Sequence, residues 1–285
     1  MLAREQAADG GGGPRLGRDR ATIVTAAAVV GLGALAWASV IADASMTSMP
    51  GMEMPSGGVA GMEGRPFTAA LSLPSAAAFL ASWGVMMAAM MLPSAAPMVA
   101  LYGAVHRHAD RTGQGGISAF LFALLYLFAW LLFGIPVYGA QLAVDALLMA
   151  DPMAASLLPF LLAIVLVAAG AYQFSPLKAA CLRACQSPLG FLMARWRPGY
   201  RGTFRLGLSH AAYCIGCCWA LMAVLVAAGA MGLHWVLLIA ALVAAEKLLA
   251  GGIWIARTAG ALLVVLGVLV AVNPGLYVVL RGMPM

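Results

Sequence analysis

The stretch from Ser209 to Leu221, SHAAYCIGCCWAL, concentrates side chains that bind soft metal ions. It contains His210 and three of the chain's five cysteines, Cys214, Cys217 and Cys218. On a helical wheel with His210 at the origin, Cys214 lies at about 40°, Cys217 at about −20° and Cys218 at about 80°. One imidazole and three thiols are costly to bury without a purpose. The pattern predicts a metal site, although cysteine alone is a common buried small residue.

A second pair of thiols precedes this motif, in the segment YQFSPLKAACLRACQSP. Cys181 and Cys185 are four residues apart. They share one face if Pro176 opens a short helix, as proline in a first helical turn does. Lys178 and Arg183 lie beside them and favour thiolates. The segment indicates a metal or redox role, and the alternative is a pair of inert small residues.

Methionines form a further candidate ladder in WGVMMAAMMLPSAAPM, which runs from Trp83 to Met98. Met87, Met91 and Met98 fall within about 40° of one another on a helix. Thioethers select soft ions such as Cu(I), so the segment is a candidate route for a metal ion. Ordinary apolar packing is the competing interpretation, because methionine is a flexible core filler.

A polar segment, SMTSMPGMEMPSGGVAGMEG, carries five more methionines. Methionine in such a segment has no core to fill, and thioethers bind metal without deprotonation, which suits an oxidising compartment. We expect metal capture there, and a low-complexity linker is the alternative. The residues concerned are Met46, Met49, Met52, Met54 and Met62.

Ionisable residues elsewhere give weaker signals. Glu246 closes an apolar span, and a carboxylate at membrane depth is a functional candidate. An interfacial pair of Glu246 with Lys247 is an equally simple interpretation. His106 and His108 are expected in a solvated loop.

The elements that position these groups must be membrane helices. The chain has 285 residues, of which 64% are hydrophobic and 9% charged. In lipid every backbone group needs an internal hydrogen bond, which a helix provides. The apolar residues do not alternate with polar ones as they do in the strands of a β-barrel. We predict an all-α, polytopic membrane helix bundle of about seven spans, the second and third tilted or broken at Pro93, Pro97 and Pro136. The spans are 22–42, 73–103, 117–149, 153–174, 204–231, 233–250 and 253–272.

The charges orient this bundle. With the N-terminus inside, 14 of the 16 Lys and Arg residues fall on the cytoplasmic side, a clear positive-inside bias. The basic character therefore reflects orientation, which argues against a nucleic-acid partner. We expect a disordered basic tail (1–21), a first transmembrane helix or signal anchor (22–42), a Met-rich extracytoplasmic loop (43–72) and a metal-binding transmembrane domain (73–275). The A-x-A pattern at residues 42–44 leaves cleavage of the first span open.

The motifs WGVMMAAMMLPSAAPM, YQFSPLKAACLRACQSP, SHAAYCIGCCWALM and AAEKLLAGG, in this order, resemble a bacterial family of predicted metal-binding integral membrane proteins. The resemblance covers about residues 75–275. It implies a multi-pass protein of the bacterial inner membrane. It also implies that the methionine pairs, Cys181, Cys185, His210, Cys214, Cys217, Cys218 and Glu246 are candidate functional positions.

These observations favour capture, transfer or delivery of Cu(I), because Cu(I) accepts both thioether and thiolate ligands. Zinc and mercury are the alternative ions, and zinc would not use the thioethers as ligands. Besides lipid and the ion itself, a metal chaperone or a cuproenzyme is the expected partner. The alternatives are a membrane thiol or metal oxidoreductase and an accessory assembly protein of a copper enzyme. The sequence leans against an enzyme, and it shows no Walker motif for ATP-driven transport.

Overall fold

The computed structural model describes residues 20–47, 71–111, 117–228 and 233–280, and every regular element in these ranges is helical. The all-helical prediction is therefore confirmed. In chain order the elements are α1 (Arg20–Thr47), α3 (Leu73–Arg111), α4 (Ala119–Ala150), the 3-10 helix η2 (Pro152–Leu157), α5 (Leu158–Gln173), α6 (Pro176–Gln186), α7 (Pro188–Arg195), α8 (Gly199–Ala227), α9 (Leu233–Leu248), α10 (Gly252–Val272) and α11 (Leu276–Leu280).

Five of the described helical segments are long and apolar enough to cross a membrane: α3, α4, η2 with α5, α8 and α10. The other two predicted spans also coincide with helices: among its described side chains α1 has an apolar run over Ala27–Ala42, and α9 has 16 residues. Large apolar side chains face outward, such as Leu262 and Val272, which are 70% and 79% exposed. Such a surface suits acyl chains. The chain is a multi-pass membrane protein, whereas seven crossings and an inside N-terminus stay predictions.

The prolines do not interrupt their helices. Helix α3 continues through Pro93 and Pro97, and α4 continues through Pro136. Pro93 and Pro97 remove the hydrogen bonds that the carbonyls of Ala89 and Pro93 would otherwise accept. Ser94 lies between these prolines, and its hydroxyl donates to the carbonyl of Met91 at 3.0 Å. The expected break points are therefore absent from these two helices.

Two helix boundaries differ from the sequence prediction. Helix α3 extends to Arg111, so His106 lies on a helix and not in a loop, while the side chain of His108 lies outside the described residues. Helix α8 begins at Gly199, which has a φ of 80°, and not near Arg205. The cysteine motif therefore lies nearly two turns deeper in its helix than expected.

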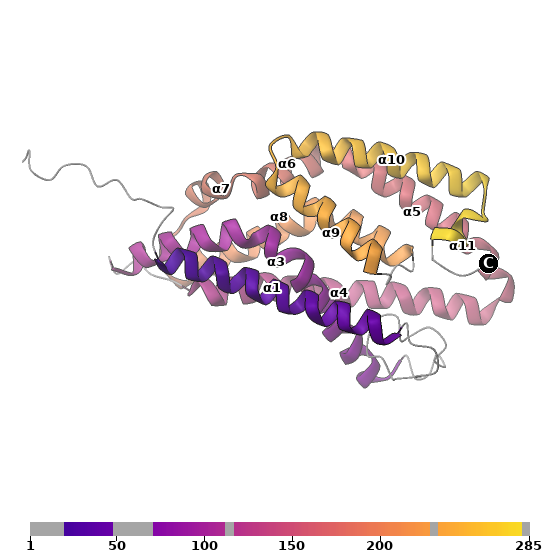
Figure 1. Cartoon of the computed structure of the whole chain (residues 1–285), viewed down its shortest axis with the longest axis horizontal. Helices are drawn as coiled ribbons and strands as arrows, with labels where there is room; N and C mark the ends of the chain where they lie inside the picture. Colours follow the sequence, from indigo (N-terminus) through magenta and orange to yellow (C-terminus); the bar gives the residue numbers. More distant parts are fainter. Residues whose placement is uncertain (1–19, 48–70, 112–116, 229–232, 281–285) are drawn as a thin grey trace, which may run out of the picture.

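The helices lie side by side along the long axis of the molecule (Figure 1). Helix α1 packs along α3 and α10 along α5, while α4 contacts both α3 and α8. The short helix α6 lies against α8 and also contacts α9. In its most apolar stretch, α8 is 56% buried, against 22% for α4 and α10. The helix that carries the cysteine motif is thus the most enclosed span among those described.

An aromatic layer stabilises the interior between α3 and α4. Phe79, Trp83, Tyr126 and Trp130 are all at most 1% exposed. The indole nitrogen of Trp83 donates to the backbone carbonyl of Trp130 at 3.0 Å, which satisfies this buried donor. This layer belongs to the same core cluster as the buried cysteines.

Glycines set the close approach of α5 and α10. A Cβ atom on Gly260 would lie 2.7 Å from the Cβ of Gln173 and 2.8 Å from the carbonyl oxygen of Gly170. A Cβ atom on Gly170 would in turn lie 2.6 Å from the carbonyl oxygen of Gly260. Small residues at membrane helix interfaces allow backbones to approach in this way. The pairing places α10 directly behind the end of α5 from which α6 continues.

We predict that Gly260→Val destabilises the bundle, because the added methyl groups would meet backbone atoms of α5. Overpacking of this kind costs about 1–3 kcal/mol. Gly139→Val is the matched control, since a Cβ atom at Gly139 would have no neighbour within 4 Å. Thermal unfolding of the purified proteins in detergent measures both effects. Equal losses for the two variants would contradict the packing described here.

Candidate metal centre

The motif of α8 faces the interior of the bundle. His210, Cys214, Cys217 and Cys218 are all buried, with exposed fractions between 1% and 4%. Because residues three and four apart share one side of a helix, these side chains form a single stripe. The stripe therefore points into the bundle and not to its outer surface.

Helix α6 brings a second set of thiols to this stripe. Ser175 caps the helix, its hydroxyl accepting from the backbone N–H of Lys178 at 3.0 Å, and Pro176 occupies the first turn. The predicted short helix is therefore present. A Cβ atom on Gly216 of α8 would lie only 2.9 Å from Sγ of Cys181. The glycine thus leaves the space in which Cys181 packs against α8.

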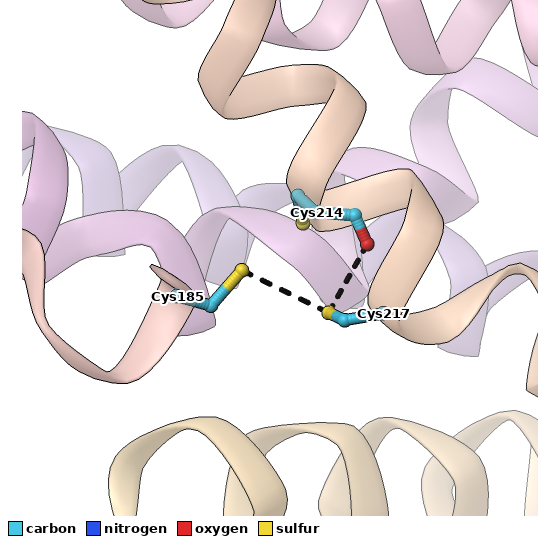
Figure 2. A group of neighbouring side chains, drawn as sticks. All are labelled: Cys185, Cys214 and Cys217. Atoms are coloured by element: carbon cyan, nitrogen blue, oxygen red, sulfur yellow. Dashed lines mark hydrogen bonds between the residues drawn. The ribbon is translucent and has the colours of Figure 1, made fainter. Parts of the chain in front are cut away.

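Three thiols converge between these helices (Figure 2). The sulfur atoms of Cys185, Cys214 and Cys217 all lie within 4.8 Å of one another. Sγ of Cys185 is 3.8 Å from Sγ of Cys217. We call these three residues the thiol cluster. Its sulfur atoms are close enough to bind one soft metal ion, and they come from two helices that are far apart in the sequence.

Lys247 of α9 supplies a positive charge beside the thiol cluster. Its Nζ atom lies 3.0 Å from Sγ of Cys214 and 3.9 Å from Sγ of Cys218. It also approaches Oγ of Ser94 at 3.5 Å and Sδ of Met91 at 3.7 Å. Lys247 is only 6% exposed, and none of the described carboxylates forms a salt bridge with it. The sequence pattern offered Lys247 only as an interfacial partner of Glu246 and did not predict its contacts with sulfur.

Two polar groups lie within hydrogen-bonding distance of Sγ of Cys214. Its Sγ lies 3.1 Å from the hydroxyl oxygen of Tyr126 as well as beside Lys247. The thiols of Cys217 and Cys218 instead donate to the backbone carbonyl of Cys214, at 3.2 and 2.9 Å. Hydrogen bonds from donors favour an anionic acceptor. Cys214 is therefore best placed to carry the negative charge of the cluster.

The thiols of α6 lie outside the five candidate spans. Burial raises the pKa of Cys181, and the nearby Cys217 adds to that rise. Hydrogen bonds with Cys214 and Cys217 raise the pKa of Cys185 well above its usual value, and burial acts in the same direction. Both groups are thus neutral thiols until a metal cation displaces their protons.

Glu246 has partners other than the thiols. Its carboxylate forms an ion pair with Lys178, with 2.6 Å between Oε2 and Nζ, and it accepts from the side chain of Gln173 at 3.2 Å. Lys178 also donates to the backbone carbonyl of Cys217. The ion pair therefore joins α6, α8 and α9 immediately behind the thiol cluster. This geometry indicates a positioning role for Glu246.

A cavity of about 150 Å³ borders the thiol cluster. Its lining comes from α3, α6, α8, α9 and the junction of α6 and α7, and consists of Ser94, Ala95, Pro97, Met98, Cys185, Gln186, Pro188, His210, Cys214, Lys247 and Leu248. The ring of His210 stacks with Phe122 and Tyr126. Its Nε2 atom is buried and has no hydrogen-bond partner among the described residues. His210 is outside the thiol cluster but lines the same cavity as Cys214.

The methionines of α3 divide between two packing regions. Met87 and Met91 are fully buried in the core cluster that contains the cysteines, whereas Met98 packs in a neighbouring cluster and lines the cavity. Met91 thus contacts Lys247 beside the thiol cluster, and Met98 lines the cavity. The side chain of Met46, and all of Met49, Met52, Met54 and Met62, lie outside the described residues.

The model of the PpoB2 family, described as a copper chaperone, matches residues 80–270, which is more than half of the chain. No curated protein and no solved structure matches the chain. The matched segment contains all five cysteines, Lys178, Glu246 and Lys247.

We predict that Lys178→Met destabilises the protein more than the double change Lys178→Met with Glu246→Met. The single change leaves a buried carboxylate without its partner, which costs about 3–5 kcal/mol, whereas removal of both charges is far milder. Unfolding of the detergent-solubilised proteins measures the difference. The double variant should still bind metal, so a loss of metal in a folded double variant would contradict a purely positioning role for this ion pair.

Proposed function

The chain belongs to the PpoB2 copper chaperone family, and on this premise we propose that it is a membrane-embedded Cu(I) chaperone whose ion binds to the thiol cluster. The observation that carries the proposal is the convergence of Cys185, Cys214 and Cys217 within 4.8 Å. Cu(I) accepts two or three soft ligands, and thiolate is the strongest of the side chains present. The chain handles copper as a family member, and its cluster supplies a binding site of the required chemistry.

Lys247 lowers the cost of placing anionic ligands in the apolar interior. Cu(I) held by the three thiolates of the cluster carries two net negative charges, and Lys247 offsets one of them from 3.0 Å. Two unit charges about 4 Å apart interact with about 4 kcal/mol at an effective dielectric constant of ~20. Lys247 therefore supports binding of the ion through its thiolate ligands.

The remaining candidate ligands have different roles in this proposal: transfer, packing and capture. Met98 and His210 line the cavity beside the cluster and are positioned to bind the ion during transfer. Cys181 and Cys218 pack next to the cluster without belonging to it. The extracytoplasmic methionines serve capture, and a cuproenzyme or a metal chaperone is the partner. The site of action is the bacterial inner membrane.

We predict that the double change Cys214→Ser with Cys217→Ser abolishes most Cu(I) binding, because it removes two of the three sulfur ligands. Cys181→Ser is the matched control, since Cys181 is a buried thiol of the neighbouring helix outside the thiol cluster. Copper content per protein, measured after purification under reducing conditions, separates the variants. Equal copper in the wild type and the double variant would refute the site. A reversible disulfide and no copper in the wild type would favour the oxidoreductase.

We predict that Lys247→Met weakens Cu(I) binding by about 10- to 100-fold, the loss expected for a partly screened charge pair. Competition with chromophoric chelators measures the affinity. Lys247→Arg should retain most of the affinity. Ser94→Lys in the Lys247→Met background should restore part of it, because Oγ of Ser94 lies 3.5 Å from Nζ of Lys247. An unchanged Cu(I) affinity in a folded Lys247→Met variant would argue against a role of Lys247 in binding.

A further inference from the structure

The cavity beside the thiol cluster is lined by residues from five structural segments. Its inner wall carries Cys185 and Cys214, and its outer part is formed by Gln186, Pro188 and Leu248. Leu248 is 51% exposed and Gln186 is half-buried, so this side reaches the surface at the junction of α6 and α7. The cavity therefore connects two of the cluster's sulfur atoms with the outside of the bundle.

The lining is suited to an anionic soft ligand. It contains the ammonium group of Lys247 and the unpartnered Nε2 atom of His210, and its described residues include no carboxylate. A volume of about 150 Å³ compares with about 30 Å³ for one molecule of liquid water. It accommodates a group of the size of a cysteine side chain. A thiolate combines this size with the charge and softness that the lining and a bound Cu(I) ion select.

We propose that the cavity is the port through which the thiolate of a copper acceptor reaches the bound ion. This inference rests on the proposed function. The sulfur atom of the incoming thiolate bonds to Cu(I) while the bond between Cu(I) and Sγ of Cys185 breaks. Cys185 leaves as a thiolate and takes up a proton from solvent, which balances the proton that the acceptor thiol lost on ionisation, and copper stays monovalent. Cys185 is the leaving ligand because it is the least buried of the three thiols and lies on the short helix α6.

The experiment measures transfer of copper from the loaded wild-type protein to 2-mercaptoethanol by stopped-flow absorption. The rate should rise in proportion to the thiolate concentration, as an associative exchange requires. Leu248→Trp narrows the outer side of the cavity and Ala95→Leu fills its wall. Both should bind the same amount of copper but slow the exchange by about tenfold or more, equivalent to at least ~1.4 kcal/mol in the barrier.

Leu249→Trp is the matched control, because Leu249 is the next residue, is 55% exposed and does not line the cavity. It should leave the rate unchanged. Leu248→Ala adds no bulk and should speed exchange, which tests the port even if the bulky variants do not fold. A rate independent of thiolate concentration, or unaffected by changes at Leu248, would overturn the port. Absence of copper from the wild type would instead refute the proposed function before any exchange is measured.

Discussion

The arrangement of this bundle depends on one electrostatic constraint: sulfur ligands that bind as anions must have a positive charge beside them in an apolar interior. A bare thiolate is unfavourable at low dielectric constant. Lys247 meets this constraint, because its ammonium group lies 3.0 Å from Sγ of Cys214. The cation must in turn be buried without a carboxylate partner. Helices α3, α8 and α9 therefore have to meet where the ammonium group contacts Met91, Cys214 and Cys218.

The second buried lysine shows how the site keeps Lys247 available for sulfur. Glu246 is adjacent to Lys247 in the sequence, yet its carboxylate pairs with Lys178 of α6. Neighbouring residues on a helix point in different directions, so α9 presents its acid to α6 and its base to α8. If Glu246 faced Lys247 instead, the ammonium group would be neutralised by oxygen. Because Glu246 pairs with Lys178, this ion pair anchors α6, and Lys247 stays available as the positive charge beside the thiols.

The sequence predicted the parts of this structure that follow from local periodicity. The seven apolar spans coincide with helices, and the four-residue spacing of Cys181 and Cys185 on a proline-started helix is as expected. The sequence did not reveal which of the five thiols meet, because that depends on the packing of α6 against α8 through Gly216. It also did not reveal the role of Lys247. A Glu–Lys pair at a span end has the same local pattern whether its charges bind each other or residues on two other helices.

The two helices of the thiol cluster bury their sulfur atoms to different degrees, and this difference determines which ligand exchanges first. Cys214 and Cys217 belong to the most enclosed span described, whereas Cys185 is half-buried on an 11-residue helix. Helix α6 is nevertheless anchored at its start by Lys178, which binds both Glu246 and the backbone of Cys217. The anchor lies seven residues, about two turns, before Cys185. Gln186, next to Cys185, also donates to the backbone carbonyl of Glu246 at 2.7 Å, so Cys185 can leave the ion by rotation of its side chain while α6 stays in place. Such a ligand exchanges first and leaves the ion on the two thiols of α8, with the cavity on the side from which it departed.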